Sequence, residues 1–380
     1  MNNIFLDRIS QFEPGDFPFI SVYLNTETNE NGQRDFDSFL KKQLSEHEDK
    51  YESGTSNRES YDSDVLKIEE FVSKIEPSTS GVAVFASTGR EDFFEAFEFE
   101  VPFDDNHFFV LEKPRIYPLV RLISQNPMFA VVSADTNSAN IYVFKRGKTI
   151  EREEIGGTKT NRSEVRGWSQ MRYQRHIENF HQQHAKEVIT ELENIVRDEK
   201  IDRIILAGDQ AVIIPILREE MSKELNEKVI EVLSLNVNTP EHELLDAAMQ
   251  AVQKNDTVVD KEKIDYLLEH NYDEGVGVAG FAKTLTALLN GQVQELYITS
   301  DIENITYNTG QINKILKDYA PGEDGDMPDP HRHTLLIDEL LVRAAESADE
   351  IRFIEDPELL KEAGGVGAIL RYQAKVVSNP

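Results

Sequence analysis

Short apolar runs of strand length alternate with longer segments of helical periodicity along most of this chain. Residues 17–24 (FPFISVYL), 201–207 (IDRIILA) and 293–299 (VQELYIT) are such runs, and polar or glycine-containing turns follow each of them. In residues 177–195, by contrast, apolar side chains recur at steps of three and four residues, which predicts one long amphipathic helix. Strands this apolar need other layers to cover them. The alternation therefore predicts α/β and α+β domains.

The length of the chain, 380 residues, is enough for two or three domains with sizeable cores. Pro114, Pro118 and Pro127 interrupt the segment that follows the first strands, and residues 255–262 form a polar stretch after a helical one. We therefore expect three domains. Their expected bounds are residues 1–120 for an N-terminal α/β domain with a mixed sheet, 121–258 for a middle domain and 259–380 for a C-terminal domain.

The composition is strongly acidic, with 40 Lys and Arg against 70 Asp and Glu and a net charge of −30. Such a surface repels phosphate backbones and anionic lipids, so nucleic-acid binding would need a local basic patch. The absence of Cys excludes disulfides, thiolate zinc sites and thiol nucleophiles. No signal-peptide core begins the chain, and no apolar run approaches the roughly 18 residues of a membrane span. We expect a cytoplasmic protein that binds neither DNA nor membranes.

One segment, residues 156–186, departs from this acidity. Against two acids, Glu164 and Glu178, it carries six basic residues: Lys159, Arg162, Arg166, Arg172, Arg175 and Lys186. A loop with glycines runs here into the start of the long helix, where free N–H groups and the helix dipole favour anions. RNA or a phosphorylated ligand would suit this segment. The alternative is a solvated basic helix face that pairs with the acids of neighbouring domains.

The same segment resembles a known family. RGWSQMRYQRHIENFHQQHAKEV (residues 166–188) is similar to the middle domain of the archaeal and eukaryotic class-I peptide release factors, in which a Gly-Gly-Gln loop precedes a helix of the form R-F-x-R. Arg172, Tyr173 and Arg175 match that helix. The resemblance implies a ribonuclease H-like middle domain.

Further motifs of the family follow in the same order. GVGVAGFAKTLTALLNGQVQELYITSD resembles the start of the third domain, and GGVGAILRY resembles its closing signature, which implies an α/β/α sandwich. ISVYLN matches the N-terminal domain in outline. The decoding motifs are absent, because Glu59 replaces the Lys of the stop-codon loop and the second motif needs a Cys. The whole resembles the bacterial members of the superfamily, a group related to the hibernation factor Balon.

The resemblance implies a catalytic loop at Gly167 and Gln170. In the family, a Gln orients water on the ester carbonyl of peptidyl-tRNA, and glycines keep the loop thin. This chain has one such glycine, and without gaps Trp168 occupies the place of the family's Gln. The Gly-x-x-Gln spacing is similar to that of eukaryotic rescue hydrolases. Gln170 is therefore either the residue that positions water or a polar residue at the start of a helix.

The residues around the loop are expected to bind RNA. They are Lys159, Arg162, Arg166, Trp168, Arg172, Arg175 and His176. The basic side chains would bind phosphates, and steps of three and four residues place 172, 175 and 176 on one helical face. Trp168 would stack on a base, a contact worth about 1 to 3 kcal/mol. The alternatives are ion pairs with surface acids and, for Trp168, a hydrophobic anchor.

Other catalytic patterns are weak. His181 and His184 have a ligand-like spacing, but no third ligand is evident nearby, and His331 and His333 are no better, so we expect no metal and no cofactor. Asp135, at the end of a predicted strand, fits a turn better than a nuclease carboxylate. Asp209, after another strand, fits a helix N-cap better than a phosphate cradle.

Three functions remain open. The first is codon-independent hydrolysis of peptidyl-tRNA on stalled ribosomes, in which Gln170 positions water. The second is a non-catalytic protein that occupies the ribosomal A site, as in hibernation. The third is an interaction protein that uses its acidic surface on a translational GTPase. The partners expected for the first two are the A site, its rRNA and peptidyl-tRNA.

Overall fold

The computed structural model describes most of the chain. The described residues are 8–9, 11–13, 15–28, 34–90, 92–145, 148–156, 169–272, 275–301, 305–308, 310–312, 314–315 and 332–372, of which 145, 148–156, 169–179 and 332–335 are described in their backbone alone. The chain forms two compact units, one of Asn126–Val258 and one of Met1–Gln125 with Val259–Pro380. The division into three domains stays a prediction. Within these described residues the strands form three separate sheets.

The N-terminal part of the chain builds a four-stranded sheet in the order β3-β2-β1-β4. Its elements are β1 (Phe19–Asn25), α2 (Phe36–Glu48), α3 (Ser56–Val72), β2 (Gly81–Ser87), β3 (Phe93–Phe99), β4 (His107–Leu111) and α4 (Tyr117–Gln125). All of its strand pairs are antiparallel, so the sheet is not of the mixed type that we expected. Short connections join β2 to β3 and β3 to β4, and neighbouring strands that follow one another closely pair antiparallel.

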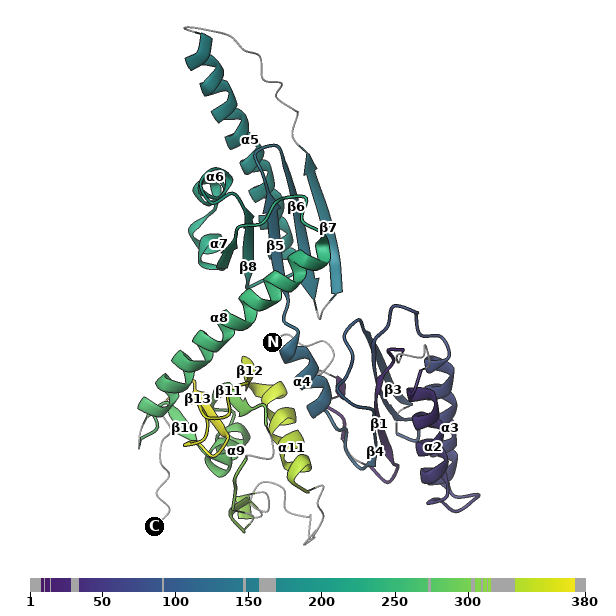
Figure 1. Cartoon of the computed structure of the whole chain (residues 1–380). Coiled ribbons are helices and arrows are strands. Elements are labelled where there is room, and N and C mark those ends of the chain that lie inside the picture. The colour runs from purple at the N-terminus through teal and green to yellow at the C-terminus, as the bar shows by residue number, and fades with distance from the viewer. Residues whose placement is uncertain are drawn as a thin grey trace. The chain divides into compact units, whose positions relative to one another are not determined.

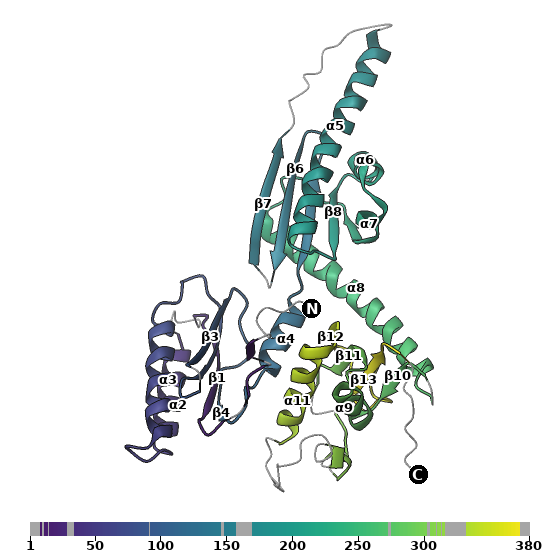
Figure 2. The same ribbon diagram turned by 180° about the vertical axis from the view of Figure 1, so that it is seen from behind.

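Both faces of this sheet are buried, which explains the continuous apolar run of β1. Ile20 and Val22 pack with α2 and α3, which lie side by side on one face (Figures 1 and 2). Phe19 and Tyr23 point to the opposite face, where one hydrophobic cluster joins the sheet to α4 and to apolar residues of the C-terminal part. A strand covered on both faces loses the alternation of a half-exposed strand.

The middle part of the chain forms a five-stranded sheet in the order β7-β6-β5-β8-β9. Its elements are β5 (Phe129–Ala134), β6 (Ser138–Lys145), β7 (Lys148–Gly156), α5 (Ser169–Asp198), β8 (Ile204–Gly208), α6 (Ile213–Glu220), α7 (Lys223–Glu227) and β9 (Val229–Leu233). The first three strands are antiparallel, and β8 and β9 add in parallel beside β5. This order is the ribonuclease H-like topology that we expected.

The C-terminal part of the chain forms a mixed four-stranded sheet in the order β10-β13-β11-β12. Helix α8 (Glu241–Glu269) leads into it: the first half of α8 packs on the five-stranded sheet and its last turns belong to this part. The other elements are β10 (Gly277–Ala279), α9 (Phe281–Leu289), β11 (Val293–Thr299), α11 (Arg332–Ser347), β12 (Glu350–Ile354) and β13 (Val366–Leu370). Leu285 of α9 and Leu340 of α11 pack on one face, and Ile264 and Leu267 of α8 pack on the other. The predicted α/β/α sandwich is therefore confirmed.

Helix α8 continues through residues 255–262, where we expected a boundary. The helix does not break there, although the division between the two compact units, at Val258 and Val259, falls within this stretch. Ion pairs hold polar side chains of the stretch on the helix surface. Asp256 binds Arg203 at 2.9 Å, and Asp260 binds Arg352 at 2.7 Å. Neither Gly nor Pro interrupts this stretch, so nothing in the backbone ends the helix.

Two glycine positions follow the expected logic of helix ends and tight turns. Gly291 comes directly after Asn290, the C-cap of α9, with φ +64°, the left-handed conformation that favours glycine at this position. Gly365, in the closing signature, has φ +82°, and a Cβ there would lie 3.0 Å from Ile305 Cγ1. The signature glycines thus allow a close approach of two chain segments. Among the described residues, no helix has the length and apolar character needed to cross a membrane.

Candidate functional site

The end of β7 and the start of α5 frame the segment that the sequence singles out. Ser138 pairs with Gly156, so β7 ends beside the turn that joins β5 to β6. Helix α5 then begins at Ser169. Figures 1 and 2 both show that the N-terminal half of α5 extends beyond its sheet. The first turns of α5 therefore stand at the tip of the unit.

The C-terminal half of α5 is fixed by packing. Its buried residues recur at steps of three and four: Ala185, Val188, Ile189, Leu192, Ile195 and Val196. They form one cluster with β5, β6, β8 and α6. Because burial of such a stripe supplies most of a helix's stability, this half anchors the projecting half.

The predicted site residues divide into two groups. Gln170, Arg172, Arg175 and His176 lie in the first two turns of α5, and their side chains lie outside the described residues. The rest of the set, which is Lys159, Arg162, Arg166, Gly167 and Trp168, lies wholly outside the described residues. The helical backbone places positions 172, 175 and 176 on one side of α5. The role of each of these residues stays a prediction.

Asp135 organises a turn at the end of β5. Its Oδ1 atom accepts hydrogen bonds from the N–H groups of Asn137 at 2.7 Å and Ser138 at 2.8 Å, and from the Ser138 hydroxyl at 3.2 Å. One carboxylate oxygen is thus occupied by the turn between β5 and β6. This is the turn role that the sequence favoured over a nuclease carboxylate.

Asp209 also forms a turn, but not the N-cap that we expected. Its side chain accepts from the N–H of Ala211 at 2.8 Å, and its main-chain oxygen accepts from the N–H of Ile213 and of Ile214, each at 3.2 Å. The N-cap position of α6 belongs to Val212, whose side chain has no polar atom. The carbonyl of Asp209 satisfies first-turn N–H groups that a capping side chain would otherwise bind.

Two histidines on α5 differ in environment. His184 is 2 % exposed, and both of its ring nitrogens lack a hydrogen-bond partner among the residues that the structure describes. His181 lies nearby, and burial together with His184 lowers the pKa of its imidazole. No group of three metal-ligating side chains occurs within the described residues. His331 lies outside them, as does the side chain of His333.

Residues 54–60, which contain Glu59, run directly into α3 and include its first residues. Thr55 is the N-cap of α3, and its hydroxyl accepts the N–H of Arg58 at 3.3 Å. The guanidinium of Arg58 forms ion pairs with Glu48 and with Asp62, the latter at 2.7 Å. Its charge is therefore used within the protein and not offered to a ligand.

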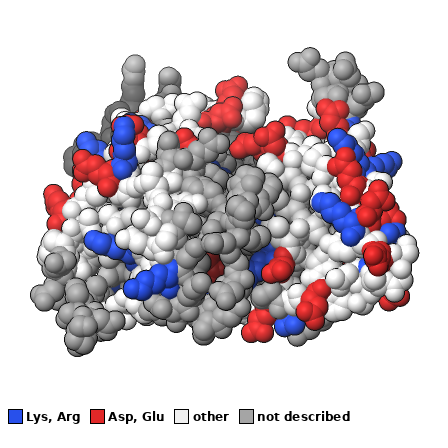
Figure 3. Space-filling model, turned by 90° about the horizontal axis from the view of Figure 1, so that it is seen from below, with Lys and Arg blue, Asp and Glu red and all other residues white. Residues whose placement is uncertain are grey.

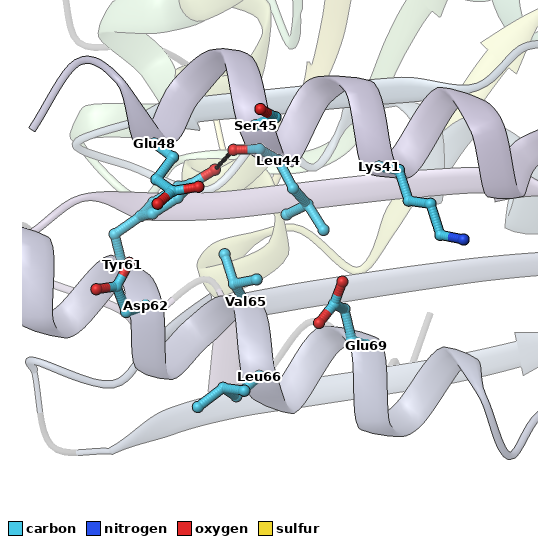
Figure 4. Close-up of a pocket in the computed structure, with 9 residues that line it drawn as sticks. All are labelled: Lys41, Leu44, Ser45, Glu48, Tyr61, Asp62, Val65, Leu66 and Glu69. Atoms are coloured by element: carbon cyan, nitrogen blue, oxygen red, sulfur yellow. Dashed lines mark hydrogen bonds between the residues drawn. The ribbon is translucent and has the colours of Figure 1, made fainter.

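A hollow of about 400 Å³ lies beside this segment, between α2 and α3 (Figure 4). Leu44, Val65 and Leu66 supply its apolar surface, and the Tyr61 hydroxyl donates to the Leu44 carbonyl at 2.7 Å. Lys41 and Glu69 lie at one end of the hollow in Figure 4. The hollow joins an apolar floor to charges of both signs, which gives it no selectivity for an anion.

A buried ion pair that sequence reasoning missed joins the start of α4 to α11. Arg115 pairs with Asp338, and each side chain is 6 % exposed. Asp338 Oδ1 also accepts the N–H groups of Ile116 at 3.1 Å and Tyr117 at 2.9 Å. Burial raises the pKa of Asp338 to about 6, although Arg115 and the two N–H groups act in the opposite direction. The two residues are far apart in the sequence, so no local pattern connects them.

On the side of the molecule drawn in Figure 3, the described residues form no broad basic patch. In Figure 3, described Lys and Arg side chains lie singly or in small groups, and several of them lie next to acidic ones. The concentration of basic residues therefore remains a property of the sequence segment 156–186.

Comparison with known proteins bears on that segment directly. Residues 114–253 match the model of bacterial archaeo-eukaryotic release factor family 10. Over this range the chain is similar to the bacterial archaeo-eukaryotic release factors. The matched range begins just before α4, contains the whole five-stranded sheet with α5, and ends within α8.

Three solved structures illustrate what this chain is similar to. The archaeal translation termination factor aRF1 is 15% identical to this chain, with a TM-score of 0.26. The match covers 97% of this chain and 96% of the aRF1 chain. Archaeoglobus fulgidus Pelota is 14% identical, with a TM-score of 0.33, and the match covers 77% of this chain and 80% of the Pelota chain. S. cerevisiae Dom34 is 12% identical, with a TM-score of 0.41, and the match covers 79% of this chain and 82% of the Dom34 chain. Dom34 is described as a translation termination-like factor that interacts with Hbs1.

Proposed function

We propose that this release factor-like protein binds the ribosomal A site in the cytoplasm and hydrolyses peptidyl-tRNA without reading a stop codon. The observation that carries the proposal is the match of residues 114–253 to the release factor family model, because this range contains both the basic segment and α5. In this role Gly167 gives the loop its narrow profile, and Gln170 holds a water against the ester carbonyl.

The chemistry asked of Gln170 is positioning. A neutral amide can accept and donate hydrogen bonds but cannot act as a general base, so proton transfer falls to the ribosome or to the ribose of the substrate. Alignment of water and ester is itself a large effect, because a well-oriented reaction avoids several kcal/mol of entropy loss. The site needs no cofactor and no metal.

The basic residues of the segment would hold the protein in the A site. Lys159, Arg162 and Arg166 in the loop, with Arg172, Arg175 and His176 on α5, would neutralise rRNA phosphates, and Trp168 would stack on a base. The acidic remainder of the chain would repel RNA elsewhere and so favour contact through this segment.

A second proposal is that the protein occupies the A site without chemistry. It is favoured by Trp168, which stands in the place of the family's Gln in an ungapped alignment and adds bulk where the family has a thin loop. Delivery by a translational GTPase, and contact with it through the acidic surface, is a separate proposal for a partner. It would remain if ribosome binding were not found.

The test uses ribosomes that carry labelled peptidyl-tRNA and an empty A site, with co-sedimentation and peptide release both scored. Gln170→Ala should abolish release and leave co-sedimentation unchanged. Gln183→Ala is the matched control, because Gln183 lies on the exposed part of the same helix and bonds to Glu187 at 3.0 Å. Binding without release by the wild-type protein would select the second proposal.

Charge reversal separates binding from chemistry. Arg172→Glu and Arg175→Glu should each weaken co-sedimentation and reduce its dependence on salt, because fewer phosphate contacts release fewer counterions. Arg197→Glu is the control, since Arg197 lies near the other end of α5 and pairs with Asp198 at 3.2 Å. If neither wild-type binding nor release occurs, the ribosomal proposal is overturned.

A further inference from the structure

Two exposed tyrosines and a half-buried histidine lie where α8 ends, in the C-terminal part of the chain. The rings of Tyr266 and His270 stack with centroids 4.0 Å apart and an interplanar angle of 29°. The ring of Tyr272 lies 6.3 Å from that of His270. Tyr266 is 46% exposed and Tyr272 is 62% exposed. We call these three residues the aromatic cluster.

The histidine of the aromatic cluster is held in place by the backbone. Its Nδ1 atom lies 2.8 Å from the carbonyl oxygen of Tyr266, and because a carbonyl can only accept, Nδ1 carries the proton and donates. Its own carbonyl accepts the N–H of Gly277 at 3.0 Å, which ties the helix end to β10. His270 therefore supports one face of the Tyr266 ring, and the ring is ordered before any partner arrives.

The core does not need the aromatic cluster. The residues of α8 that pack on the sheet are Ile264 and Leu267, and both are at most 1% exposed. Tyr266 and Tyr272 point to solvent instead. Exposed tyrosines that lie together are typical of protein interfaces, where a rigid ring supplies contact area at a small entropic cost.

The charges around the aromatic cluster select the kind of partner. Glu262, Asp265 and Glu269 are exposed, and they form no hydrogen bond or ion pair within the described part of the chain. They lie within two helical turns of Tyr266. The same stretch has two basic residues, of which Lys261 is exposed and Lys263 already pairs with Glu295 and Glu350. Three free carboxylates favour a cation and repel the phosphates of a nucleic acid.

We propose that the aromatic cluster and these carboxylates bind an arginine-containing basic segment of a partner polypeptide. A guanidinium would stack on the face of Tyr266 that His270 leaves open, and the adjacent carboxylates would accept its N–H groups in pairs. Arginine fits better than lysine because its planar fork can stack and bond at the same time. This surface lies far along the chain from the α5 segment, and the proposal does not depend on ribosome binding.

The test measures binding of a fluorescein-labelled peptide of alternating arginine and glycine to the full chain by fluorescence anisotropy, at near-physiological ionic strength. Tyr266→Ala should weaken binding about tenfold, the effect of losing a partly desolvated cation–π contact. Tyr266→Phe keeps the ring and should keep the affinity. Asp265→Asn with Glu269→Gln should weaken binding to a similar degree, and a lysine–glycine peptide should bind more weakly and respond less to Tyr266→Ala.

A matched control removes the effect of the overall acidity. Glu59→Gln with Glu69→Gln takes two exposed carboxylates from α3, and this variant should bind like the wild type. Unchanged binding by Tyr266→Ala, or an equal loss in the α3 control, would overturn the proposal. The proposal would also be overturned if single-stranded RNA bound the wild-type protein and Tyr266→Ala abolished that binding, since the aromatic cluster would then bind a nucleic acid.

Discussion

Asp338 neutralises the buried guanidinium of Arg115 and at the same time caps the first turn of α4 through two backbone N–H groups. Phe109 lies against the same guanidinium, at 4.9 Å from its ring centre to the Arg115 carbon. One carboxylate thus links the antiparallel N-terminal sheet, α4 and α11. The packing of α4 against the N-terminal sheet and α11 therefore depends on a contact between residues that are distant in the sequence.

Asp338→Asn should lower the free energy of unfolding by about 3 to 5 kcal/mol, because it leaves a buried guanidinium without its counter-charge. Urea unfolding followed by circular dichroism measures the change. Asp349→Asn is the control, since its pair with Arg371 is exposed and should contribute less than about 1 kcal/mol. Adding Arg115→Met to Asp338→Asn should restore part of the loss; no recovery would mean that the charge is not the cause.

Asp64 should make the protein less stable as pH rises from about 4 to 6. Its carboxyl is fully buried, its Oδ1 accepts the Thr88 N–H at 2.7 Å, and its Oδ2 has no hydrogen-bond partner among the described residues. Burial raises its pKa to about 6. The native state therefore holds a proton that the unfolded chain has lost in this range, so deprotonation costs stability that is retained at lower pH.

Asp64→Asn isolates this contribution. We compare the free energy of unfolding of the variant with that of the wild type at two pH values. The variant should gain about 1 to 3 kcal/mol relative to the wild type when the pH is raised from 4.5 to 7.5. Any constant cost of burying an amide cancels in this comparison. A difference that does not change with pH would show that Asp64 titrates as it does in the unfolded chain.

Two glycine-to-alanine changes should differ in size. Both Gly291 and Gly365 have positive φ, which costs an L-residue about 1 to 2 kcal/mol. At Gly291 the space is open, whereas at Gly365 a Cβ would lie within about 3.1 Å of Ile305 and Thr299. Thermal unfolding should show the larger loss for Gly365→Ala. Equal losses would mean that the contact relaxes without cost.

Asp135→Ala should destabilise the turn between β5 and β6 by about 1 to 3 kcal/mol, because two backbone N–H groups and a hydroxyl lose their acceptor. Asp135→Asn keeps the Oδ1 acceptor and should cost clearly less. Hydrogen exchange at Asn137 and Ser138 reports the turn directly. If the two variants behave alike, the carboxylate charge and not the turn geometry is what matters.

Local sequence signals predicted a large part of the fold. The apolar runs became β1, β8 and β11, the three-and-four periodicity became the anchored half of α5, and Gly291 follows the C-cap of α9 as expected. These features depend on neighbours within a few residues, where backbone sterics and side-chain periodicity act. The same holds for the basic segment 156–186, which is visible in the composition of one stretch of chain.

Tertiary contacts decided the rest. Helix α8 runs unbroken through the stretch where the two compact units divide, and the N-terminal sheet is antiparallel where a mixed one was expected. Asp338 and Arg115 form an ion pair although more than half of the chain's length separates them in the sequence. Tyr266 is exposed because the opposite face of α8 packs on the sheet. The sequence by itself determined the strand and helix segments and the basic segment, because these are local. The structure alone decided which charges are buried together and which rings face solvent, because burial depends on residues that are distant in the chain.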